Sequence, residues 1–256
     1  MMRRARVVGL MALLLFAGCQ SSPSQKRGVD TAEERRKLAE INTQLALAYM
    51  RDGDNELAMR KLEKAIEADP KSVGAHTAMA LLHARLGQTD EAERSYRSAL
   101  SLDPQNAAAL NNYGQFLCQQ KRYDEGLAKF QDAVKNPLNR TPESALTNAG
   151  LCAQQSGDLA GAEQHFRAAL QRVPTLTPAL LAMAQLSLEQ QNHLQARGYY
   201  QRYLAVGPQN PRTLWLGIRI EHALEDRDAE ASYALQLKNR FPDSPEYGLY
   251  QQGKFD

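Results

Sequence analysis

The residues of this chain that are best suited to chemistry are its three cysteines and five histidines. Such side chains could ligate a metal ion, form a disulfide or pair as a nucleophile and its base. The motifs that organise them for these tasks, such as HExxH, CxxC, a phosphate-binding GKS or GKT and GxSxG, do not occur. His76 and His83 lack two further ligands at zinc-binding spacing. We therefore expect no catalytic residue, no metal site, no cofactor and no small-molecule substrate.

Two of the cysteines, Cys118 and Cys152, are 34 residues apart, so whether they can meet depends on the elements that carry them. Five prolines show the same spacing, because those at 70, 104, 174, 208 and 242 recur at intervals of 34, 70, 34 and 34. A fixed period near 34 is typical of the tetratricopeptide repeat, in which each unit is a pair of antiparallel helices. The sequence therefore predicts an all-α fold, a right-handed superhelix of about six helix pairs.

The residues between the prolines support this assignment. If each proline is position 32, the repeats begin at residues 39, 73, 107, 143, 177 and 211. Positions 8 and 20 then carry alanine or glycine in the first five repeats, and position 24 carries a large apolar residue, namely Leu62, Tyr96, Phe130, Phe166 and Tyr200. Small residues let the two helices of a pair approach closely, and the large side chain fills the space between neighbouring pairs. No segment of about 100 residues remains for a separate catalytic domain.

Local signals predict where individual helices begin and end. Thr31 with Glu34 forms a capping-box pattern, so we expect the first helix to begin well before residue 39. Gly53, Gly87 and Gly157 occupy position 15, where a left-handed residue ends the first helix of a pair.

Two regions depart from the repeat. The segment 136–142 makes the third repeat two residues longer, which predicts a wider turn. The sixth repeat is degenerate, as expected of a terminal unit, and Trp215 with Leu216 lies off the usual pattern. We expect Tyr247, Tyr250 and Phe255 to cover the apolar end of the stack.

The repeat numbering brings the two cysteines to neighbouring helices. Cys118 is position 12 of repeat 3 and Cys152 is position 10 of repeat 4, each on the first helix of its pair. Neighbouring helix axes lie about 8–10 Å apart, and inward-facing residues on them can reach the roughly 4.4–6.8 Å between Cα atoms that a disulfide needs. We therefore hypothesise a bridge across the irregular junction. The alternative is that both are buried free thiols that fill the first helices.

The N-terminal segment is predicted to be a targeting signal and not part of the fold. Arg3, Arg4 and Arg6 precede a short apolar run that ends at Phe16. The following Ala17-Gly18-Cys19 resembles the bacterial lipobox, whose cysteine is acylated and becomes the new N-terminus. The resemblance implies a signal peptide over 1–18 and lipidation of Cys19. The composition of 19–30, rich in serine with proline and glycine, predicts a flexible tether, and the repeat period assigns 31–256 to the helical stack. An ordinary signal peptide with an incidental cysteine is the alternative.

The charge of the mature chain weighs against nucleic acid as a partner. Loss of the three N-terminal arginines reduces the 31 basic residues to 28 against 29 acidic ones, so the formal net charge changes from +2 to −1. A nucleic-acid-binding protein is expected to carry a basic stripe.

Gln20 directly after the cysteine resembles the sorting pattern that directs such lipoproteins to the outer membrane, facing the periplasm.

In this repeat family, positions 2, 5, 9, 12 and 13 of each first helix line the concave face. The residues carried over as the partner-binding groove are Leu47, Met50, Arg51, Thr77, Leu81, Arg85, Asn111 and Gln115. An apolar groove flanked by arginine suits an extended peptide or an amphipathic helix, and amides can pair with its backbone. The alternative is that the apolar members simply pack inside the superhelix.

The lipobox followed by six repeats resembles the type IV pilus biogenesis lipoprotein family called PilF or PilW. The stretches 111–118 and 148–152, with their paired cysteines, carry the resemblance most clearly. The resemblance implies a pilotin, an outer-membrane lipoprotein that binds the pilus secretin and promotes its outer-membrane localisation and multimerisation. The alternative is another periplasmic adaptor lipoprotein with these repeats, in β-barrel assembly or cell-wall synthesis.

Overall fold

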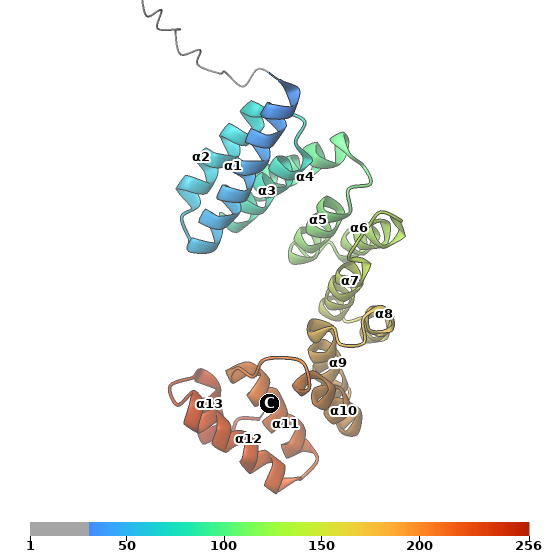
Figure 1. The fold of residues 1–256 in the computed structure, drawn as a ribbon. Helices are drawn as coiled ribbons and strands as arrows, with labels where there is room; N and C mark the ends of the chain where they lie inside the picture. The colour runs from blue at the N-terminus through green and yellow to red at the C-terminus, as the bar shows by residue number, and fades with distance from the viewer. Residues whose placement is uncertain (1–30, 256) are drawn as a thin grey trace, which may run out of the picture.

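The computed structural model describes residues 31–255, which form thirteen α-helices and no strand within that range (Figure 1). The helices are α1 (Ala32–Asp52), α2 (Asn55–Ala68), α3 (Val73–Arg85), α4 (Thr89–Leu102), α5 (Ala107–Gln119), α6 (Tyr123–Lys135), α7 (Pro142–Ser156), α8 (Leu159–Arg172), α9 (Thr177–Glu189), α10 (His193–Leu204), α11 (Pro211–Ala223), α12 (Arg227–Arg240) and α13 (Pro245–Gln251). None of the helices in this range is long and apolar enough to cross a membrane.

The first twelve helices form six consecutive pairs, and α13 follows the last of them (Figure 1). α3, α5, α9 and α11 begin at residues 73, 107, 177 and 211, and α7 begins one residue before 143. α1 begins earlier, at a capping box in which the Thr31 hydroxyl accepts the Glu34 N–H and the Glu34 carboxylate accepts the Thr31 N–H. The all-α repeat architecture expected from the sequence is confirmed.

The helices of the first five pairs pack together at their small residues. The alanines at positions 8 and 20 are fully buried, and so are the large side chains at position 24. In repeat 3 both small positions are glycine, and the two backbones are in close contact: a methyl group on Gly126 would lie 2.9 Å from the carbonyl oxygen of Gly114. The same methyl group would lie 2.4 Å from the Sγ atom of Cys118. The absence of a side chain at Gly126 is therefore a packing requirement.

The first helix of each pair ends on a left-handed residue, with or without glycine. Gly53, Gly87 and Gly157 have φ of 86°, 73° and 88°, as the sequence predicted. Repeats 3, 5 and 6 place Lys121, Gln191 and Glu225 at the same position, with φ of 61°, 60° and 58°. Non-glycine residues tolerate this conformation at a small cost, so the turn is set by the helix pair and not by glycine alone.

The stack curves because its two layers pack differently. The first helices of neighbouring pairs contact one another along the whole series α1, α3, α5, α7, α9 and α11. Within the described residues the second helices contact only the first helices of their own and the following pair, apart from α12, which also contacts α13. The layer in mutual contact forms the inside of the curve, so α1, α3, α5, α7, α9 and α11 present the inner face (Figure 1).

A charged network joins repeats 2 and 3. The Glu93 carboxylate accepts hydrogen bonds from Arg122 Nη1 at 2.8 Å, Tyr113 Oη at 2.9 Å and Arg97 Nη2 at 2.7 Å. The hydrogen bond from Arg122 is the main reason that the pKa of Glu93 falls to about 2. Glu93 therefore stays ionised at neutral pH and fixes α4 against α5 and the start of α6.

The C-terminal end is covered as expected. Tyr247 and Tyr250 from α13, together with Phe255, pack against the core formed by Leu214 and Ile218 of α11 and its neighbours. The last pair would otherwise expose this apolar face, because no further pair follows it in the described chain.

The packing predicts opposite outcomes for two glycine substitutions. Gly126→Ala should destabilise the fold by about 1–3 kcal/mol, because its new methyl group meets a backbone oxygen and the Cys118 sulfur. Gly198→Ala, in the middle of α10 with open space at its Cβ position, should be neutral or stabilising by about 0.5–1 kcal/mol. Urea unfolding followed by circular dichroism measures both, and equal midpoints for the two variants would contradict the close approach.

Candidate protein-binding groove

Position 9 of every first helix faces the inside of the curve and shows how the inner face changes along the stack. These residues are Leu47, Leu81, Gln115, Leu151, Gln185 and Arg219. Leu47 and Leu151 have 38% and 40% of their surface exposed, although both are large and apolar. Their place on the concave face is what makes them candidates for contact with a protein, because repeat stacks use that face for binding.

The first part of this face is formed by Leu47, Met50 and Arg51 of α1 with Leu81 and Arg85 of α3, here called the N-terminal groove. Met50 is half-buried against the core of repeat 1, and Leu81 against the aromatic cluster of Tyr96. The Arg85 guanidinium donates to the backbone oxygen of Met50 and so joins the two helices. Leu47 and Arg51 remain exposed.

A cavity of about 220 Å³ continues the N-terminal groove toward repeat 3. Its wall includes Leu81 and Arg85 from α3 and Gln115 from α5, with the Tyr96 ring beneath. The structure thus brings together three of the residues that the sequence assigned to the groove. Leu47, Met50 and Arg51 lie outside this wall, on α1.

Thr77 does not belong to the binding surface, which corrects the sequence assignment. The residue is 7% exposed, and its hydroxyl donates to the Val73 backbone oxygen at 2.8 Å. Thr43 and Thr147, at the same repeat position, are buried and bonded in the same way. In these three repeats the threonine hydroxyl is bonded to the carbonyl four residues earlier in its own helix, so it is not available to a binding partner.

The middle of the inner face is polar. Asn111 accepts a hydrogen bond from the Asn148 amide at 2.9 Å, which links α5 to α7 across the longer turn. Asn111 and Asn112 also line a cavity of about 520 Å³ with Arg140 and Ser144. Amide groups around an open cavity can pair with the backbone of a bound extended segment.

The last part of the inner face contains an apolar cavity that the sequence did not predict. It measures about 350 Å³ and is lined by Leu151, Pro178, Leu181, Ala182, Gln185, Arg212, Thr213, Trp215, Leu216 and Arg219. Trp215 and Leu216, which read as off the pattern in the sequence, occupy positions 5 and 6 of α11. They point inward with the same register as their equivalents Leu181 and Ala182 of α9.

The structure contains the disulfide between Cys118 and Cys152, with their Cα atoms 5.7 Å apart. Both residues are buried, at 5% and 2% exposure, and they pack with Phe130 and Ala149. The bridge fixes α5 to α7 at the junction whose turn is two residues longer than in the other repeats. Glycine at position 20 of repeat 3, where repeats 1, 2, 4 and 5 have alanine, was a sequence signal for it, because Gly126 makes room for the sulfur.

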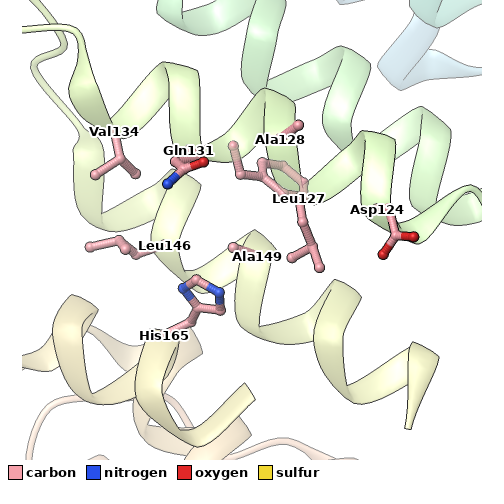
Figure 2. Close-up of a pocket in the computed structure, with 9 residues that line it drawn as sticks. Asp124, Leu127, Ala128, Gln131, Val134, Leu146, Ala149 and His165 are labelled. Atoms are coloured by element: carbon pink, nitrogen blue, oxygen red, sulfur yellow. The ribbon is translucent and has the colours of Figure 1, made fainter. Parts of the chain in front are cut away.

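The outer face carries a cavity of about 410 Å³ between α6, α7 and α8 (Figure 2). Leu127, Leu146 and His165 point toward it from three different helices (Figure 2). Burial lowers the pKa of His165, so this histidine is a neutral packing group at neutral pH. Over residues 31–255 no cluster of histidine, cysteine and acidic residues could hold a metal ion.

Known proteins define the class of this fold. Tetratricopeptide-repeat family models match residues 77–140 and, in a second model, 49–96 and 153–214. The chain is therefore a tetratricopeptide-repeat protein.

It is 37% identical over 251 residues to the type IV pilus assembly protein PilF of Pseudomonas aeruginosa, covering 98% of this chain and 99% of that protein. The solved structure of PilF from that organism superimposes with a TM-score of 0.72 at 38% identity and covers 86% of this chain and 99% of its own. The structure of PilW, a widely conserved type IV pilus biogenesis factor, superimposes with a TM-score of 0.76 at 33% identity and covers 84% of this chain and 99% of its own. This chain belongs to the PilF and PilW family of type IV pilus biogenesis proteins.

The disulfide predicts a defined thiol count and a stability loss. In a Cys19→Ser variant, denatured without reductant, Cys118 and Cys152 should give no titratable thiol, and two after reduction. Closing a loop of 34 residues should contribute about 3–4 kcal/mol, so Cys118→Ser with Cys152→Ser should lower the unfolding free energy by that order. Two reactive thiols before reduction would show that the cysteines are free.

Proposed function

We propose that this protein is a pilotin: a lipid-anchored outer-membrane scaffold that captures the type IV pilus secretin in its N-terminal groove and promotes its localisation and assembly. Membership of the PilF and PilW family supports a role in pilus biogenesis. The single structural observation that carries the binding role is the exposed apolar surface at Leu47, beside Leu81 and the two arginines of the same inner face.

The chemistry of the N-terminal groove suits a peptide segment of a protein partner. Leu47 and Leu81 offer apolar surface, and Arg51 leaves a cation exposed at its edge. Gln115 extends this surface toward the amide-rich centre. An amphipathic helix or extended segment with apolar residues and a flanking acid would satisfy all three features.

The anchor is the second part of the proposal. Cys19 and the segments 1–18 and 19–30 lie outside the described residues, so their role rests on the lipobox resemblance. Two or more acyl chains on Cys19 would hold the chain stably at a membrane. A groove held there raises the local concentration of every secretin subunit it binds, and assembly is then favoured without any catalytic step.

The N-terminal groove is tested by placing negative charge on its apolar surface. Leu47→Asp with Leu81→Asp should reduce secretin capture by about tenfold or more, because both substitutions place a carboxylate on apolar contact surface. The matched control is Leu194→Asp with Leu235→Asp, two leucines that are 75% and 57% exposed on α10 and α12. Co-purification of secretin and counting of its heat-resistant multimers provide the readout.

Leu81 is half-buried, so an aspartate there could destabilise the protein. The thermal unfolding of the same variants therefore has to be measured to verify that they are folded. Leu47→Asp alone, at the more exposed position, should keep the wild-type melting temperature and still weaken capture. Normal multimers in the folded double variant would place the secretin site elsewhere on the protein.

The anchor is tested by Cys19→Ser. This variant should fold normally, lose membrane association and leave secretin subunits poorly delivered to the outer membrane, because the groove then diffuses freely. Sucrose-gradient fractionation of the cell envelope shows whether the variant is still associated with the outer membrane. Retention of the variant in the outer-membrane fraction would contradict lipid anchoring through this cysteine.

A further inference from the structure

The inner face of the last repeat is covered by the chain's own C-terminal tail. After α13, the tail turns at Gly253, where φ is 66°, and returns to α11 (Figure 1). The Phe255 ring stacks on His222 with centroids 3.7 Å apart and on Trp215 with centroids 5.7 Å apart. Arg219 Nε donates to the backbone oxygen of Phe255 at 2.9 Å.

The three residues that hold Phe255 are on the binding side of their helix. Trp215, Arg219 and His222 are positions 5, 9 and 12 of α11, three of the positions that line the inner face in this repeat family. An aromatic side chain between two rings, with its backbone carbonyl bound by a guanidinium, is a mode of peptide recognition. The tail thus shows which chemistry this surface accepts.

The same surface continues into the apolar cavity of repeats 4 to 6. Trp215 and Arg219 both hold the tail and line that cavity, which measures about 350 Å³. Its lining includes two arginines, Arg212 and Arg219, and no acidic residue. The Arg212 side chain is 91% exposed, with Nε 3.9 Å from Glu246, so an exposed pair of this kind contributes little and leaves the cation open to a partner.

The tail contacts α11 through a single residue. Gln252, Gly253 and Lys254 are exposed, and Phe255 is the side chain that anchors this segment. Tyr247 and Tyr250 of α13 still cover the end of the core when Phe255 leaves. The backbone of the tail is bonded to α13 through the N–H groups of Gly253 and Lys254, and it meets α11 through Phe255. Because one residue makes the contact with α11, that contact can open without unfolding α13.

We propose that the inner face of repeat 6, with its adjoining cavity, is a second docking site for a protein partner, and that the tail is its resident occupant. The partner is an extended segment in which an aromatic residue takes the place of Phe255 and an adjacent carboxylate meets Arg212 or Arg219. The site is separate from the N-terminal groove, so it does not depend on what that groove binds.

The test uses a fluorescent, C-terminally amidated peptide with the sequence of residues 249–256, in which an aspartate follows the phenylalanine. Fluorescence polarisation should show that full-length Phe255→Ala binds this peptide about tenfold or more tightly than the wild type, because a tethered competitor acts at about millimolar effective concentration. Changing the peptide's phenylalanine to alanine should abolish binding, and changing its aspartate to lysine should weaken it.

Controls assign the binding to the site. Trp215→Ala combined with Phe255→Ala should lose the peptide, and Arg219→Ala with Phe255→Ala repeats the test at a polar side chain that does not belong to the apolar core. Leu47→Asp with Phe255→Ala should bind normally, which separates this site from the N-terminal groove. Equal or absent binding to Phe255→Ala and wild type would overturn the proposal. Concentration-dependent dimers of the wild type that Phe255→Ala lacks would also overturn it, because the occupant would then be the tail of a second copy.

Discussion

The close approach of the two helices in each pair is the constraint on which the rest of the structure depends. Alanine or glycine at positions 8 and 20 lets the backbones come together, as Gly114 and Gly126 show most clearly. The large side chain at position 24 then packs between this pair and the next. Because the first five pairs repeat the arrangement, their first helices line up on one side and the stack curves toward them.

The curve makes the inner face, and the residues left over from packing decide what that face can bind. Position 5 is used for packing in repeats 1, 2 and 4, where buried threonines satisfy helix carbonyls. No position-9 residue is fully buried, and its type varies from leucine to glutamine to arginine along the stack. The result is apolar surface near both ends with amides between them. The disulfide holds α5 against α7 within this amide-rich middle, where the turn is longest.

The fold was predictable because its signals are periodic. Five prolines and the small residues placed the helix pairs, and the capping box at Thr31 placed the start of α1. Single positions were less predictable. Lys121 takes a left-handed conformation without being glycine, since the helix pair imposes the turn. Thr77 was assigned to the groove because family positions do not reveal which way one side chain is bonded.

The C-terminal site escaped prediction for a different reason. The sixth repeat lacks the usual small and large residues, so the periodic pattern fades where Trp215 lies. Its role emerges only from contacts between α11 and a tail that is 36 residues further along the chain than Arg219. Such long-range contacts leave no spacing rule in the sequence.

The most direct test of the central claim, that the inner face of the first repeats holds the secretin, is site-specific photocrosslinking in intact cells. A photoreactive phenylalanine analogue at position 47 should crosslink to the secretin, whereas the same group at position 194, on the outer helix α10, should not. Crosslinks to the secretin from position 194 and none from position 47 would contradict the account.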